Sequence, residues 1–176
     1  MALVHVDAHA DINDTMFGEK VTHGTIFRRA LEEELVDGAK MFQIGLRATG
    51  YSAEDFDWSR QQGARVVQAE ACWYKSLSPL MDEVRATIGD STPTYLSFDI
   101  DGLDPAIAPG TGTPEPAGLS APQGLEIIRG MYGTNQVGAD LVEVSPPYDT
   151  TGNTALLAAN LVFEMLCSFP GCQRRA

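Results

Sequence analysis

The sequence predicts an α/β fold in which helices cover both faces of a mostly parallel sheet, giving three α-β-α layers. Short apolar or β-branched runs alternate with helical patterns, and the connections between them are short. No repeat, low-complexity tract or linker divides the chain. Its 176 residues, 44% hydrophobic and 20% charged, suffice for one sizeable core but not for two ordinary domains. We therefore expect a single domain over residues 1–176.

Five strands are predicted from runs of apolar and β-branched residues. Each run is only four to eight residues long and is bounded by polar residues, Gly or Pro. Such near-continuous apolar runs are typical of parallel strands that are buried on both faces. The predicted strands are 3–6, 41–45, 65–68, 94–98 and 137–144.

Five helices are predicted from apolar positions at helical spacing and from residues that favour helix ends. Over residues 25–36 the apolar side chains fall on one face, with the glutamates mostly opposite. Ser52 and Ser120 are candidate N-caps, the second in an S-x-x-Q capping box. Ser78-Pro79 is a strong helix start. The predicted helices are 25–36, 52–62, 78–89, 120–132 and 154–169.

The charge balance excludes several classes of partner. Against 24 acidic residues stand only 12 basic ones, a formal charge of −12, with no basic cluster longer than an Arg pair. Nucleic acids and anionic membranes are therefore poor partners, whereas a small cation would be attracted. No apolar run approaches the roughly 20 residues that a membrane span needs. The N-terminus turns acidic at once and has no Arg before Arg28, so we expect no targeting segment and a cytoplasmic location for the chain as given.

The first predicted strand is followed by a segment rich in potential metal ligands. Asp7, His9 and Asp11 alternate along the chain, so in an extended segment their side chains point to one side. Ligands of parallel sheets bind beyond the carboxyl ends of the strands, which is where these residues fall. Two carboxylates and an imidazole that converge there would repel and desolvate one another unless a cation neutralised them.

A second cluster follows the predicted strand 94–98. Asp99 and Asp101 stand two residues apart with a hydrophobic residue between them. A lone Asp-x-Asp after a strand is most often a solvated loop or a helix cap, but two clusters at equivalent strand ends favour a metal site. Four carboxylates and one imidazole form a hard donor set that suits Mn²⁺ or Mg²⁺ better than structural zinc. Their number fits two bridged ions better than one.

Three further residues have both a structural and a functional interpretation. Glu143 lies inside the predicted strand 137–144, where it could bind a cationic group or be a buried structural glutamate. His23 directly precedes a predicted helix, where it could cap the helix or transfer a proton. His5 shares the strand phase of Asp7 but lies deeper, so we expect it to pack or to support a ligand rather than to bind a metal.

These motifs resemble the two metal signatures of the ureohydrolases, the arginase and agmatinase family. The resemblance rests on residues 3–11 and on residues 97–105 with their continuation to Gly118, and it extends over essentially the whole chain. It implies an arginase-like fold, two Mn²⁺ ions per subunit and, from animal relatives, a mitochondrial location. The segments that resemble animal mitochondrial agmatinase-like proteins most closely are 23–25, 43–47 and 142–148.

The implied reaction is the manganese-dependent hydrolysis of a guanidino compound to an amine plus urea, by a hydroxide that bridges the two ions. Agmatine, which yields putrescine, is the expected substrate, and 4-guanidinobutyrate is the alternative. Glu143 would face the cationic guanidinium of the substrate, and His23 would stand at the rim for proton transfer or substrate contact. The implied metal ligands are Asp7 and Asp99, which bridge the ions, His9 and Asp101, which complete one ion, and Asp11, which binds the other.

The family also carries a metal-binding histidine in a Gly-Gly-Asp-His segment upstream of the first cluster, and the chain does not contain this segment. By resemblance, the chain is therefore the C-terminal portion of a ureohydrolase domain. It would lack the N-terminal strands, which we expect to flank residues 3–6. The ion held by Asp7, Asp11 and Asp99 would then be bound weakly or not at all.

Two other functions compete with hydrolysis of a guanidino compound by this chain. The chain could be a non-catalytic fragment that acts only by association with full-length subunits. It could also be a single-metal amidohydrolase of the deacetylase type, but the second acid of each cluster is what a second metal requires. We expect the partners to be a small cationic guanidino substrate and further copies of the chain in a homo-oligomer.

Overall fold

The computed structural model, which describes residues 1–48 and 55–172, contains one five-stranded sheet in which every pair of neighbouring strands is parallel. The strand order is β3-β2-β1-β4-β5. The predicted strands are all present, with ends that differ by at most two residues. Their bounds are β1 Ala2–Val6, β2 Met41–Leu46, β3 Arg65–Gln68, β4 Pro93–Asp99 and β5 Asn135–Val142.

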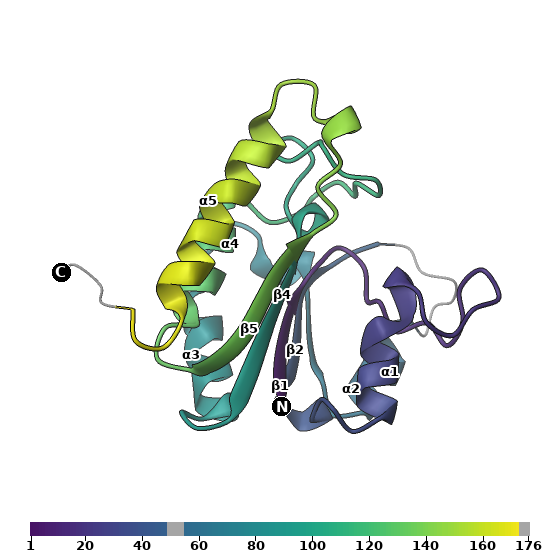
Figure 1. Cartoon of the computed structure of the whole chain (residues 1–176), viewed down its shortest axis with the longest axis vertical. Helices are drawn as coiled ribbons and strands as arrows, with labels where there is room; N and C mark the ends of the chain where they lie inside the picture. The colour runs from purple at the N-terminus through teal and green to yellow at the C-terminus, as the bar shows by residue number, and fades with distance from the viewer. Residues whose placement is uncertain (49–54, 173–176) are drawn as a thin grey trace.

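Helices cover both faces of the sheet, which confirms the three-layer α-β-α architecture (Figure 1). The helices α1 and α2 lie on one face, and α3, α4 and α5 lie on the other. Most of the hydrophobic core lies between the sheet and the second group, and a smaller cluster lies beneath α1 and α2. The helix bounds are α1 Ile26–Glu32, α2 Asp55–Gln61, α3 Ser78–Ile88, α4 Ala121–Gly130 and α5 Asn153–Ser168.

The helix ends follow the predicted signals in part. The capping box of α4 is present, with the Ser120 backbone N–H donating to Gln123 Oε1 at 3.0 Å, and α3 has its proline in the first turn. Helix α1 ends at Glu32 rather than near residue 36, because Glu34 adopts a left-handed conformation with φ +57° that no α-helix continues through. The predicted N-cap Ser52 lies outside the described residues.

The place of β1 in the sheet contradicts one prediction. This strand was expected to border strands that the chain lacks, but β2 and β4 pair with it on its two sides, so it lies at the centre. Periodicity identifies a strand without giving its neighbours, because a parallel crossover can lead to either side. The outer strand on the β4 side is β5, and there Val137 and Val142 are exposed.

None of the helices among the described residues is long and apolar enough to cross a membrane.

Candidate metal centre and active site

The two ligand clusters meet because the strands that carry them are neighbours. Val6, the last residue of β1, pairs with Phe98 near the end of β4, so both clusters leave the same edge of the sheet. The Ala8 backbone N–H donates to Asp101 Oδ1 at 3.1 Å and so connects the segments that follow β1 and β4, although the two residues are 93 positions apart in the sequence. The predicted convergence of Asp-rich segments is therefore present in the structure.

Asp7, His9 and Asp101 form one of two groups of ligand atoms. His9 Nδ1 lies 3.3 Å from Asp7 Oδ1 and 3.1 Å from Asp101 Oδ2. The His9 backbone N–H also donates to Asp7 Oδ1 at 2.6 Å. Thr113, in the long loop after β4, donates its hydroxyl to Asp101 Oδ2 at 3.1 Å. One ligand atom from each of the three residues lies within 4.8 Å of the others, a spacing that one cation could span.

The second group consists of His5, Asp7 and Asp11, whose ligand atoms also lie within 4.8 Å of one another. Asp7 belongs to both groups. Asp11 reaches the site by a turn rather than by extended alternation, since β1 ends at Val6 and Asp11 has φ +52°. Asp99 lines the same pocket but belongs to neither group, and its Oδ1 accepts the Asp101 backbone N–H at 2.8 Å. Asp99 thus also caps the short 3₁₀ turn at residues 100–102.

Burial of several acids in one place shifts their pKa values in opposite directions. Burial and the neighbouring Asp7 raise the pKa of Asp11 to about 7, and burial with Asp7 and Asp101 raises that of Asp99 to about 10. Hydrogen bonds to Asp101 and Asp7 raise the pKa of His9 to about 10. Burial alone would raise the pKa of Asp7, but His5 and His9 outweigh it and hold that pKa well below its usual range.

The donor set fits divalent cations. Four carboxylates crowd together at the end of a sheet, and without a cation the site compensates by holding protons on Asp99 and His9. Carboxylate oxygens with one imidazole are ligands that Mn²⁺ accepts readily. Asp7, His9 and Asp101 could hold one ion, with Asp7, Asp11 and Asp99 available to a second.

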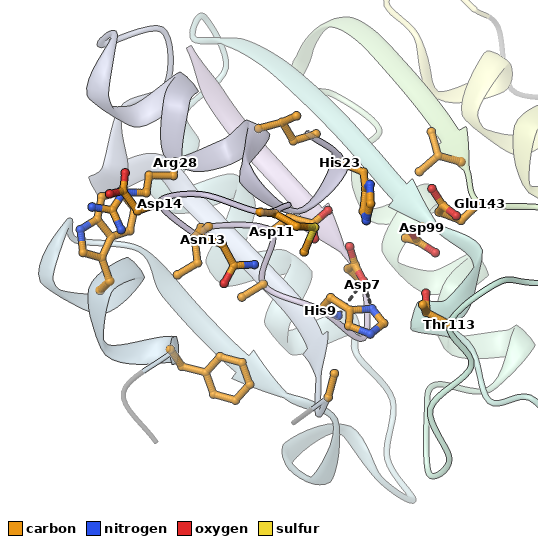
Figure 2. Close-up of a pocket in the computed structure, with 18 of the residues that line it drawn as sticks. Asp7, His9, Asp11, Asn13, Asp14, His23, Arg28, Asp99, Thr113 and Glu143 are labelled. Atoms are coloured by element: carbon orange, nitrogen blue, oxygen red, sulfur yellow. Dashed lines mark hydrogen bonds and ion pairs between the residues drawn. The ribbon is translucent and has the colours of Figure 1, made fainter. Parts of the chain in front are cut away.

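Asp7, His9, Asp11 and Asp99 line a pocket of about 910 Å³ (Figure 2). His23, which precedes α1, and Glu143, which follows β5, both lie beside Asp7 and Asp99 in this pocket. His23 is exposed, and its ring centroid lies 6.2 Å from that of Phe17. The helix after His23 is preceded instead by a capping box of Thr22 and Thr25, so His23 is not the cap.

The structure corrects the predicted position of Glu143. It was expected inside a strand that runs to residue 144, with burial as one of two interpretations. Strand β5 ends at Val142, and Glu143 follows it in the left-handed region with φ +64° and an exposed side chain. The turn aims this carboxylate into the pocket, free of the desolvation that a buried glutamate would suffer. The structural interpretation is therefore wrong.

Arg47 is a functional-site residue that the sequence reasoning did not single out. It follows β2, and its guanidinium donates to backbone carbonyls on both sides of the long loop 102–118, including Asp101 at 2.8 Å and Pro116 at 3.0 Å. The loop carries Thr113, so Arg47 holds in place the backbone on which Asp101 and Thr113 stand. No spacing rule links an arginine to a loop more than 50 residues away. The carbonyls that accept from it are those of Gly45, Asp101, Gly102, Leu103, Glu115 and Pro116.

Binding of Mn²⁺ is expected to release protons and to tighten as the pH rises. His9 and Asp99 have pKa values of about 10, so both hold a proton at pH 7 that a cation must displace. Each displaced proton makes the affinity rise about tenfold per pH unit. Calorimetric titrations in buffers of different ionisation enthalpy would count the protons. An affinity that stays constant between pH 6.5 and 8.5 would contradict this prediction.

Fold and site together define a three-layer α/β protein with a candidate binuclear metal centre at the carboxyl ends of its central strands. Residues 1–167 match the arginase family. The chain therefore belongs to the arginase family, as the sequence resemblance predicted.

Three relatives illustrate the match. The chain is 69% identical to a guanidinobutyrase of Pseudomonas aeruginosa, over 99% of this chain and 54% of the relative. It is 61% identical to a mitochondrial agmatinase of Gallus gallus, over 97% of this chain and 50% of the relative. The structure superposes on the proclavaminate amidino hydrolase of Streptomyces clavuligerus with a TM-score of 0.90 at 41% identity, covering 96% of this chain and 56% of that one. The chain thus spans about half the length of the relatives it matches.

Proposed function

We propose that this chain carries the metal centre of a hydrolase that cleaves a guanidino compound into an amine and urea. The observation that carries the proposal is the convergence of Asp7, His9, Asp11 and Asp99 in one pocket that also presents Glu143, with Asp101 in contact with His9. Membership in the arginase family and relatives named guanidinobutyrase and agmatinase support it.

In this proposal the metal ligands are those that the resemblance implies, and the ions are Mn²⁺. Bound divalent ions act as Lewis acids and lower the pKa of the water molecule bound to them, so that hydroxide is available at neutral pH. Glu143, exposed at the pocket, accepts hydrogen bonds from the guanidinium and offsets its positive charge. His23, at the rim beside Phe17, exchanges protons with solvent as the amine leaves.

For the substrate we propose 4-guanidinobutyrate first and agmatine second. The relative at 69% identity is named for guanidinobutyrate, whereas the agmatinase is 61% identical, so identity favours the guanidino acid over the agmatine expected from sequence. The pocket wall away from the ligands carries one charge of each sign, since Arg28 Nε lies 3.6 Å from Asp14 Oδ1 (Figure 2). The net charge of this wall therefore favours neither the carboxylate of 4-guanidinobutyrate nor the ammonium group of agmatine.

We place the protein in a homo-oligomer, and the name of the chicken relative supports a mitochondrial location for animal members. Association with longer subunits is the competing mode of action for the chain as given.

Urea release from 4-guanidinobutyrate, agmatine and arginine in the presence of Mn²⁺ tests the proposal. We expect urea from one of the first two substrates and a loss of more than about 100-fold in the Asp99→Asn variant, because a bridging carboxylate contributes to both ions. Asp82→Asn, on the exposed face of α3, is the matched control and is expected to retain full activity. A folded chain that binds Mn²⁺ and releases no urea from any substrate would support the non-catalytic alternative.

A further inference from the structure

Two buried polar side chains lie directly beneath the ligand clusters. His5 on β1 and Gln43 on β2 are register partners, and they are 1% and 0% exposed. Apolar residues occupy most of the rest of these strands. The His5 ring packs against Phe27, with ring centroids 4.2 Å apart, which restrains its rotation. A polar pair in such surroundings costs free energy unless its hydrogen bonds are made, so each contact specifies an orientation.

The orientation of the Gln43 amide follows from a backbone carbonyl. Gln43 Nε2 lies 2.7 Å from the oxygen of Ala10, which can only accept a hydrogen bond. The opposite orientation would bring two carbonyl oxygens to that distance, so the NH₂ group must face Ala10. Its second hydrogen is then directed to His5 Nδ1, at 3.2 Å. Gln43 Oε1 is buried without a hydrogen-bond partner among the residues that the structure describes, so the contacts of the two N–H groups set the orientation of the amide.

The orientation of the amide in turn determines the tautomer of His5. Because Nδ1 faces an N–H donor, it must accept, and the ring proton must reside on Nε2. His5 Nε2 lies 2.8 Å from Asp7 Oδ2, to which it then donates. A single line of hydrogen bonds thus runs from the Ala10 carbonyl through Gln43 and His5 to Asp7.

We propose that Gln43 is a positioning residue that acts through His5: it keeps the proton of His5 on Nε2, so that His5 orients the Asp7 carboxylate and offers no ligand atom to a metal. The proposal rests on the metal centre of the proposed function. His5 belongs by distance to the group with Asp7 and Asp11, but a protonated Nε2 has no lone pair for a cation. That group therefore supplies carboxylates alone.

The consequence for Asp7 is a carboxylate whose two oxygens are both held by donors. Oδ1 accepts from the His9 backbone N–H at 2.6 Å, and Oδ2 accepts from His5 at 2.8 Å. In the metal-free protein His9 Nδ1 lies 3.3 Å from Oδ1, where a cation bound by His9 would take the place of its proton, and Oδ2 keeps a further lone pair, as a ligand shared by two ion sites requires. Partners that orient a metal ligand in this way are typically worth about 10- to 100-fold in metal affinity.

Nuclear magnetic resonance of the metal-free protein tests the tautomer directly. The chain has three histidines, so ¹⁵N-histidine labelling gives a spectrum in which a His5→Asn variant identifies the His5 signals. We expect a protonated Nε2 and an unprotonated Nδ1 for His5. A proton on Nδ1, alone or together with one on Nε2, would overturn the proposal without any metal or substrate being added.

Two substitutions at one position test the positioning role. Gln43→Met removes the donor at similar volume, and Gln43→Glu replaces it with acceptors that draw the proton to Nδ1. We expect Mn²⁺ affinity, measured by electron paramagnetic resonance, to fall about 10- to 100-fold in both variants. In Gln43→Glu the ¹⁵N spectrum should also show the His5 proton on Nδ1.

Gln136→Met is the matched control, since Gln136 on β5 is likewise buried and has an amide nitrogen without a partner among the described residues. We expect it to lower stability and leave Mn²⁺ affinity unchanged. Equal losses of affinity at both positions would reduce Gln43 to a structural role and overturn the proposal. Failure of urea release with the expected tautomer and affinities would refute the proposed function alone.

Discussion

Replacing Asp7 with Asn is expected to lower the affinity for Mn²⁺ at both candidate ion sites. Asp7 is the only residue common to the two groups of ligand atoms found among the described residues. An amide keeps the shape of the side chain but loses the charge, and its NH₂ group would face either the His5 donor or the His9 backbone N–H. The affinity should therefore fall by more than the roughly 100-fold upper range of residues that only orient a ligand. Calorimetric titration with Mn²⁺ measures both sites.

The same titration on Asp82→Asn controls for a general loss of negative charge. Asp82 lies on the exposed face of α3 and pairs with Arg85. Because the chain has a formal charge of −12, any acid contributes weakly to long-range attraction of a cation. Asp82→Asn should bind Mn²⁺ within about twofold of the parent, since exposed charges are screened over roughly 10 Å at 0.1 M salt. A drop of similar size in both variants would show that bulk charge, rather than coordination by Asp7, governs the affinity.

Arg47→Met is expected to lower the free energy of unfolding by about 3 kcal/mol or more, because each buried carbonyl that loses its donor costs about 1–3 kcal/mol. The guanidinium donates to the partly buried carbonyls of Asp101, Leu103 and Glu115, and methionine donates to none of them. Burial lowers the pKa of Arg47, although the negative charges of Asp101 and Asp104 act to raise it. This direction is consistent with a cation enclosed by backbone. Urea denaturation followed by circular dichroism measures the change.

The variants Arg47→Lys and Arg65→Met test whether the loss of stability in Arg47→Met comes from the lost hydrogen bonds or from the lost charge. Lysine keeps the charge but has one nitrogen in place of three, so it should recover less than half of the loss. Arg65 is exposed and makes an ion pair with Glu83 at 3.0 Å, and its replacement should cost under about 0.5 kcal/mol. If Arg47→Lys matched the parent in stability, the charge alone would hold the loop and the argument from the carbonyls would fail.

The positions of the strands and helices were predictable where short stretches of sequence determine them. The strands and most helix ends follow from apolar runs, capping residues and proline, and all five strands are found. The strand order was not predictable, because adjacency depends on which crossovers pack best, and β1 accordingly lies at the centre rather than beside an open edge. The early end of α1 depends on the left-handed Glu34, a residue type with no particular preference for that conformation.

The site was predictable where its residues are close in sequence. Asp7, His9 and Asp11, and likewise Asp99 and Asp101, are spaced as metal ligands, and the structure brings both segments to one pocket. Thr113, Gln43 and Arg47 contribute through single hydrogen bonds or backbone contacts across long stretches of sequence, for which local pattern holds no signal. Glu143 was found by its charge, but its turn conformation was not.

The central position of β1 couples folding to the metal centre. The Ala8 backbone N–H and the Asp101 carboxylate that it contacts are 93 residues apart in the sequence. The ligand atoms therefore come together only after β1, near the N-terminus, has paired with β4. Pairings between parallel strands so distant in sequence form slowly. A cation that binds the assembled centre and not the unfolded chain adds RT ln(1 + [M]/Kd) to stability, about 2.7 kcal/mol at a hundredfold excess over Kd. Removal of manganese would therefore lower the free energy of unfolding as well as empty the ion sites.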